Sequence, residues 1–94
     1  MLEVQLSTRS FTKPIVTYHA HTVEFFYSTV NSGGRSFHVG HIKTFELTVD
    51  KKGRYELVLT TEHHTLSHDV DEESLGKVRD LVAEVQQAMK TVVL

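Results

Sequence analysis

Apolar and polar residues alternate with a period of two along most of the first seventy positions. In two consecutive runs, one set of side chains shares a face: Phe45, Leu47 and Val49 in the first run, and Tyr55, Leu57 and Leu59 in the second. A sheet with one face on a core and the other in water gives this pattern. The residues between the runs have the composition of a short hairpin loop, with Gly53 in the left-handed position. We therefore predict a hairpin from about Ile42 to Thr60.

Five further segments have the composition of strands: Leu2–Ser7, Ile15–Tyr18, Val23–Tyr27, Arg35–Val39 and His63–Val70. In the third of these, Val23, Phe25 and Tyr27 share the predicted inward face. The break between the second and the third falls on residues 19–22, which contain no glycine, asparagine, aspartate or proline. A turn is only weakly indicated there, and one long bent strand is the alternative.

The C-terminal segment has a different period, because its apolar side chains recur at every third or fourth position. These residues are Leu75, Val78, Leu81, Val82, Val85, Ala88, Met89 and Val92. On a helical wheel they fall within an arc of about 140°, which suits a helix packed on a sheet. We predict a helix from about Glu72 to Thr91, with Asp71 as its N-cap and a Glu73–Lys77 pair on its surface. Such a helix must cover the open face or end of a strongly bent antiparallel sheet.

The composition sets the class of protein. Ninety-four residues suffice for one domain and not for two, so residues 1–94 are predicted to form a single domain. Apolar residues at 39% and charged residues at 23% are ordinary for a globular domain. The chain has no cysteine, which excludes disulfides, thiolate metal sites and cysteine nucleophiles. A formal charge of −2 and scattered basic residues argue against nucleic-acid binding.

Membrane and export signals are absent from the sequence pattern. No apolar run approaches the ~20 residues that a spanning helix needs. The first five residues lack the basic and apolar regions of a signal peptide. We therefore expect no transmembrane segment and a cytoplasmic location.

The order of the predicted elements resembles that of the pleckstrin-homology-like (PH-like) barrel, in particular the small bacterial domains of this kind. The segments that carry the resemblance are Ser36–Leu47, Tyr55–Leu59, His63–Val70 and Asp71–Met89, within a similarity that spans Ile15 to Met89. The resemblance implies an α+β fold in which about seven antiparallel strands form a bent, partly open barrel capped by one C-terminal helix. It also implies a module that binds proteins, lipids or copies of itself and is rarely an enzyme.

Lipid binding is the part of that resemblance which the residues do not support. Phosphoinositide-binding members carry clustered basic residues around the first hairpin. The matching region here offers only Arg9 and Lys13, followed by His19 and His21. We therefore do not expect phosphoinositide binding.

Histidine is over-represented, with seven residues, and protonation of all seven would move the formal charge from −2 to +5. His19 and His21 would share one face of a strand and could chelate a metal, whereas the alternative is a polar turn. Zinc sites usually need three or four ligands, so we favour the turn and predict no metal site. His41 is in phase with apolar neighbours and is predicted to be partly buried, beside a bend or bulge at Gly40.

The densest histidine cluster lies near the last predicted strand, at His63, His64 and His68. If Leu66 and Val70 point inward, His64 and His68 share that face, and we take these two histidines as candidate ligand contacts. A solvated edge strand would explain the same polar residues without any ligand.

Two remaining questions are catalysis and association. Ser36 and Ser67 lie near histidines, but neither sits in a recognisable nucleophile motif, so we predict no enzyme and no cofactor. Phe26 and Val58 are predicted to face outward, and Val30 would extend that patch. Outward apolar residues on a small sheet can form an interface with a protein partner or a second copy, unless a loop or the N-terminal strand covers them. The sequence thus predicts a non-enzymatic PH-like binding module, with a histidine-based metal or small-ligand protein as the alternative.

Overall fold

The computed structural model describes residues 2–7, 13–27 and 34–91. Within these segments the chain forms seven strands, two short 3-10 helices and one α-helix. In chain order they are β1 (Leu2–Gln5), β2 (Ile15–His19), β3 (Thr22–Phe26), β4 (Gly34–His38), η1 (Val39–His41), β5 (Ile42–Val49), β6 (Tyr55–Thr61), β7 (Thr65–Val70), η2 (Glu72–Ser74) and α1 (Leu75–Thr91). The predicted central hairpin and C-terminal helix are confirmed. None of the helices in these segments is long and apolar enough to span a membrane.

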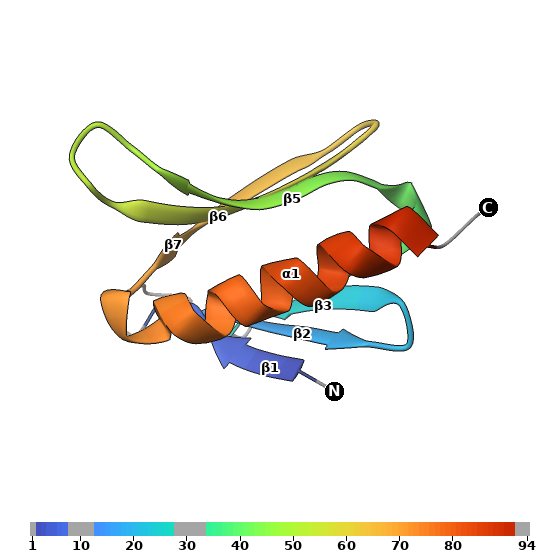
Figure 1. Ribbon diagram of the computed structural model, residues 1–94, viewed down its shortest axis with the longest axis horizontal. Helices are drawn as coiled ribbons and strands as arrows, with labels where there is room; N and C mark the ends of the chain where they lie inside the picture. Colours follow the sequence, from blue (N-terminus) through green and yellow to red (C-terminus); the bar gives the residue numbers. More distant parts are fainter. Residues whose placement is uncertain (1, 8–12, 28–33, 92–94) are drawn as a thin grey trace.

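The strands form two antiparallel sheets, and all strand neighbours within each sheet are also neighbours in sequence. The first sheet has four strands in the order β1-β2-β3-β4, and the second has three in the order β5-β6-β7. Figure 1 shows the two sheets as separate layers with α1 running along the opening between them. The protein is therefore an α+β domain in which one C-terminal helix packs on two sheets.

The sheets meet at two corners. At one corner the chain leaves β4, turns through η1 and enters β5. At the other corner the N–H of Asp71, after β7, donates a 2.8 Å hydrogen bond to the carbonyl of Leu6, after β1. Next to it, the Ser74 hydroxyl donates to the carbonyl of Gln5 at 2.7 Å. These bonds fix the start of the helix to the first strand.

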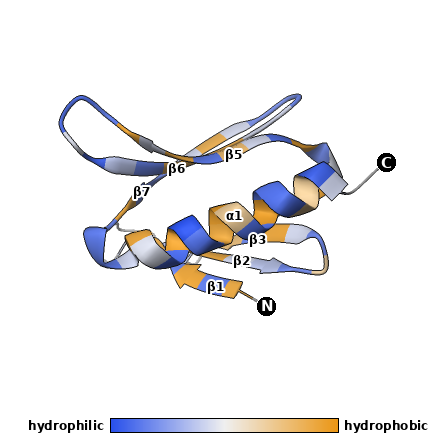
Figure 2. Ribbon diagram, in the orientation of Figure 1, coloured by the Kyte–Doolittle hydropathy of each residue, from blue (hydrophilic) through white to orange (hydrophobic). Residues whose placement is uncertain are grey.

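Helix α1 fills the opening with its apolar stripe. Its buried residues are Val78, Leu81, Val85 and Ala88, spaced three or four apart as the sequence predicted. The helix contacts β5 and β1, one edge strand of each sheet, and also η1. Figure 2 shows the hydrophobic positions of the helix and of the strands around the same interior. The Gln86 side chain also donates a 2.8 Å hydrogen bond to the Phe45 carbonyl on β5.

The core takes residues from both sheets, η1 and the helix. Its buried members are Val4, Leu6, Val16, Val23, Phe25, Val39, Ile42, Phe45, Leu57, Leu59, Val70, Val78, Leu81, Val85 and Ala88. The predicted inward positions Val23, Phe25, Phe45, Leu57 and Leu59 are all among them. Burying one such aliphatic or aromatic side chain fully stabilises the fold by roughly 1.5–3 kcal/mol.

Two expectations about the sheet edges and the helix start are wrong in detail. Val49 has the inward phase of Phe45, yet 58% of its surface is exposed. It lies at the end of β5, paired with Tyr55 next to the hairpin loop, where the hairpin extends beyond the helix (Figure 1). Asp71 occupies the N-cap position of η2, but its side chain makes no capping bond. Its carboxylate instead accepts a 3.1 Å hydrogen bond from the Ser7 hydroxyl.

The connection between β2 and β3 is a tight turn and not one bent strand. His19 pairs with Thr22, so Ala20 and His21 are the two central residues. Both have positive φ, 51° and 62°. Hairpin turns of this kind normally use Asn-Gly or a similar pair because most side chains disfavour the left-handed region. This explains why the sequence signalled the turn so weakly.

Replacing Ala20 by glycine should stabilise the protein by about 0.5–1 kcal/mol. The left-handed conformation costs an L-residue about 1–2 kcal/mol, while the greater freedom of glycine in the unfolded chain offsets about 0.5–1 kcal/mol of that gain. Urea unfolding measures the difference. The same change at Ala83, which is exposed on α1, should instead destabilise by about 1 kcal/mol. Two changes of equal sign would contradict the turn geometry.

Leu81→Ala should destabilise the protein by about 2–5 kcal/mol, because Leu81 is fully buried at the centre of the helix stripe. The matched control is Glu84→Ala, an exposed position on the same helix, which should change stability by no more than about 0.5 kcal/mol. Chemical denaturation of both variants tests the prediction. A Leu81 variant as stable as the control would show that α1 does not seal the core.

Candidate functional site

Two pairs of histidines from distant parts of the sequence, His38 with His41 and His63 with His64, line one pocket, which we call the histidine pocket. It has a volume of about 440 Å³ and lies between the β4–η1–β5 corner and the β6–β7 loop. Its lining residues are Ser36, Phe37, His38, Gly40, His41, Ile42, Lys43, Thr61, Glu62, His63 and His64. Sequence reasoning named His64 as a candidate ligand contact but missed its combination with His38 and His41, because nothing local in the sequence relates the corner near residue 40 to the loop near residue 63.

His38 is held in a defined orientation at the corner. The backbone N–H of Gly40 donates a 3.0 Å hydrogen bond to His38 Nδ1. A neutral imidazole that accepts at Nδ1 carries its proton on Nε2, so His38 presents an N–H donor on the other side of its ring. Its ring centre lies 6.4 Å from that of His21 and 6.1 Å from that of His41. The β2–β3 turn therefore adds a fifth histidine beside the pocket.

The β6–β7 loop holds the other pair of histidines in place. Thr61 Oγ1 accepts hydrogen bonds from the backbone N–H groups of His63 and His64, at 3.3 and 3.1 Å. The Thr61 N–H in turn donates to the carbonyl of His64 at 2.8 Å. These three hydrogen bonds fix the backbone of the loop, and the side chains of His63 and His64 are exposed.

His68 lies in a different environment from His64, so the predicted pair is not brought together. It is half-buried on β7, opposite Leu57. Its Nε2 lies 2.9 Å from the hydroxyl of Tyr27, and its ring packs on Phe25 with centres 5.2 Å apart. Burial lowers the pKa of His68; the nearby Asp69 opposes this and Arg35 adds to it. Burial likewise raises the pKa of Tyr27, and Arg35 counteracts that shift.

One further histidine expectation is wrong. His41 is exposed and not partly buried, because the chain leaves the strand at His38 and the alternation stops in η1. For His19 and His21 the favoured turn is confirmed, because His19 ends β2 and His21 sits in the turn, so the two do not share a strand face. Across residues 2–7, 13–27 and 34–91, no group of three or more His, Cys, Asp or Glu side chains is arranged to hold a metal ion.

Phe26 and Val58, the predicted interface residues, lie on different sheets. Phe26 is 45% exposed on β3, whereas Val58 is partly exposed on β6 between Glu46 and Ser67. They therefore do not form one continuous patch. Val30, which was expected to extend the patch, lies outside the described residues.

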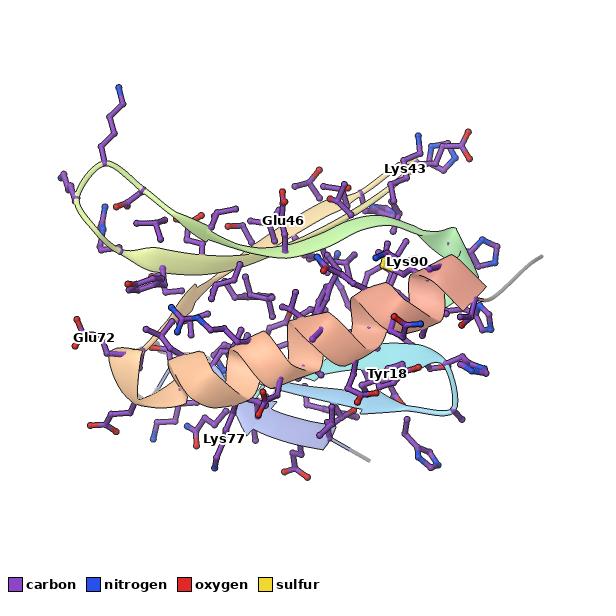
Figure 3. All side chains as sticks on the ribbon, viewed as in Figure 1. Tyr18, Lys43, Glu46, Glu72, Lys77 and Lys90 are labelled. Carbon is purple, nitrogen blue, oxygen red and sulfur yellow. The ribbon has the colours of Figure 1, made fainter. Side chains whose placement is uncertain are left out.

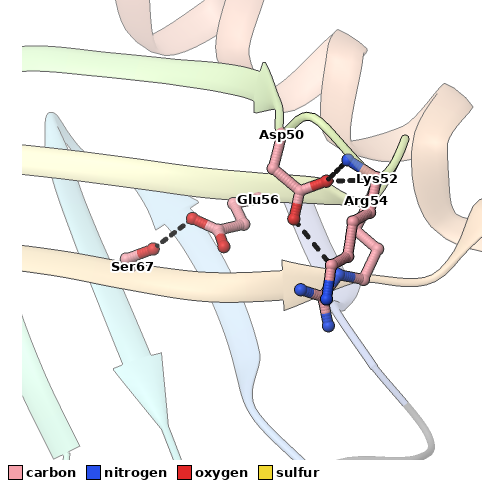
Figure 4. A network of polar contacts seen from close by, with 5 residues as sticks. All are labelled: Asp50, Lys52, Arg54, Glu56 and Ser67. Carbon is pink, nitrogen blue, oxygen red and sulfur yellow. Dashed lines mark hydrogen bonds and ion pairs between the residues drawn. The ribbon is translucent and has the colours of Figure 1, made fainter.

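The serines near histidines donate to carboxylates on neighbouring strands. The Ser36 hydroxyl donates to Glu24 at 3.3 Å, and the Ser67 hydroxyl donates to Glu56 at 2.9 Å. Figure 4 shows the second of these beside the β5–β6 loop. There Asp50 accepts backbone hydrogen bonds from Lys52 and Arg54 and pairs with the Arg54 side chain at 3.1 Å. These bonds close the loop and lower the pKa of Asp50. The hydrogen bond from the Arg54 backbone N–H contributes most to that shift.

Comparison with known proteins adds no assignment. The chain matched no protein-family model, no curated protein and no solved structure.

His68 should make the protein less stable as the pH falls. Because its pKa is lower in the folded protein, the unfolded chain binds this proton more readily, and acid favours unfolding. The stabilisation is complete above the ordinary histidine pKa of about 6.5 and is lost as the pH drops below it towards the folded value. Urea midpoints measured from about pH 8 to pH 5 should show this decline.

The control separates His68 from the six other histidines. His68→Gln should flatten the decline, whereas His64→Gln, at an exposed site, should leave it unchanged. Equal slopes in the parent and in the His68 variant would contradict the role assigned to the buried imidazole.

Proposed function

We propose that this chain is a non-enzymatic PH-like binding module that acts by protein interaction, specifically by pairing with a second copy of itself. The support from the fold is its order of elements: two antiparallel sheets of four and three strands, followed by one C-terminal helix, a topology consistent with the PH-like barrel. Fold alone assigns no function, so the proposal rests on the surface of the four-stranded sheet.

The observation that carries the proposal is the exposure of Phe26 beside a sheet edge. Phe26 and Val49 are the two large hydrophobic residues that are exposed within the described segments. Phe26 pairs with Gly34 on the edge strand β4. Because Gly34 has no side chain, the Phe26 ring lies against it, within 3.5 Å of where a Cβ would stand. The aromatic ring is thus within reach of anything that binds along β4.

β4 itself is suited to strand pairing. Of the seven described strands, only β3 is hydrogen-bonded to it, so among the described residues no strand pairs with its other edge. Among its five residues only Arg35 carries a permanent charge, and charges are a usual protection of sheet edges. Antiparallel pairing of β4 with its copy would form a two-fold symmetric dimer and cover Phe26 at the same time.

Phe26→Ser tests this proposal. Analytical ultracentrifugation at about 100 µM, where an interface with a micromolar Kd is nearly saturated, should find the parent protein dimeric. Phe26→Ser should weaken dimerisation at least tenfold, by about 1.4 kcal/mol or more. Val49→Ser is the matched control, since it removes a similarly exposed apolar residue from the other sheet. A strictly monomeric parent protein, or equal effects of the two variants, would overturn the proposal.

A further inference from the structure

The histidine pocket lies at the C-terminal end of β4, where Ser36, Phe37 and His38 line it, whereas Phe26 pairs with Gly34 at the other end of that strand. The pocket gathers side chains from two separate connections: His38 and His41 from the η1 corner, and His63 and His64 from the β6–β7 loop. His21, in the β2–β3 turn, lies beside it, with its ring centre 6.4 Å from that of His38. Lys43 also lines it. Figure 3 shows Lys43 and Lys90 at the end of the molecule where the C-terminus lies. One end of the protein therefore collects most of its histidines.

The lining offers mostly hydrogen-bond donors. His38 presents Nε2–H, because its Nδ1 lone pair already accepts from Gly40. The Lys43 ammonium has three donors and no acceptor. The Ser36 hydroxyl uses its proton on Glu24. Glu62 is the one carboxylate among the residues that line this pocket. A ligand that matches this set must supply acceptors.

We propose that the histidine pocket binds a small anion with two or more carboxylate or phosphate groups, and binds it more tightly as the exposed imidazoles of His41, His63 and His64 become protonated. Imidazoles on both the η1 corner and the β6–β7 loop favour a ligand with more than one anionic group. The pocket volume of about 440 Å³ is in the range of small-molecule sites.

The same geometry argues against a metal ion. A metal ligand must offer a free lone pair, and the neutral His38 ring has its Nδ1 lone pair occupied and its Nε2 protonated. The remaining imidazoles do not form a chelating group of three within the described chain. An anion can accept hydrogen bonds from the N–H groups, whereas a protonated ring nitrogen has no lone pair to coordinate a metal.

Acidification should change the pocket from nearly neutral to strongly positive. With neutral imidazoles, Lys43 is balanced by Glu62. Histidine is the side chain whose charge changes between pH 5 and 8. The neighbouring elements β3 and β4 and the last two turns of α1 also carry Glu24, Arg35, Glu84 and Lys90, two charges of each sign. Protonation of the imidazoles therefore sets the sign of the local field.

Calorimetric titration of the full chain with citrate and with inorganic pyrophosphate tests the proposal. Citrate carries carboxylates and pyrophosphate carries phosphates, so the two arms identify the preferred group. Binding should tighten at least tenfold between about pH 8 and pH 6, in the range where histidine titrates. The double variant His41→Gln with His64→Gln should lose at least tenfold in affinity at the lower pH. Both residues are exposed, so the fold should persist.

Controls separate the pocket from general electrostatics. Lys51→Gln removes a positive charge from the exposed β5–β6 loop and should leave the affinity unchanged. Affinities that do not depend on pH, or that fall equally in the control and the double variant, would overturn the proposal. So would zinc binding that is tighter than anion binding and is lost in the double variant. None of these results bears on dimerisation, which Phe26→Ser tests separately.

Discussion

The burial of one helix stripe between two sheet edges is the interaction on which the rest of the structure depends. Val78, Leu81 and Val85 are fully buried, and α1 contacts β5 on one sheet and β1 on the other. Each such side chain stabilises the fold by roughly 1.5–3 kcal/mol, more than the net 0.5–1.5 kcal/mol of a typical hydrogen bond such as that between Asp71 and Leu6 at the sheet corner. Without the helix, the apolar interior between the sheets would be open to water.

This arrangement also decides where chemistry can occur. The interior is filled by apolar side chains, so polar groups collect at the ends of the strands and on the edges. The η1 corner, packed against α1, sets the position of His38, and the Thr61 side chain sets the positions of His63 and His64 across from it. The one histidine inside the sheets, His68, is paired with Tyr27 and contributes to stability and not to the pocket.

Periodicity predicted the elements because the helix and the hairpin each bury one face, and a buried face leaves a repeat in the sequence. The helix stripe and the β5–β6 pairing follow directly from it. Local exceptions escaped this reasoning: Ala20 and His21 form a turn without turn residues, and His41 leaves the alternation in η1. Periodicity could not predict the histidine pocket, because the pocket joins two segments, distant in sequence, that only the tertiary fold brings together.

Native-state hydrogen exchange of α1 shows directly whether the helix seals the two sheets. If the helix seals the two sheets, the amides from Val78 to Ala88 should open only with global unfolding, at the same free energy as the central strand β6. Exchange of these helix amides at a much lower free energy, while β6 stays protected, would show that the sheets hold together without α1 and would contradict the account.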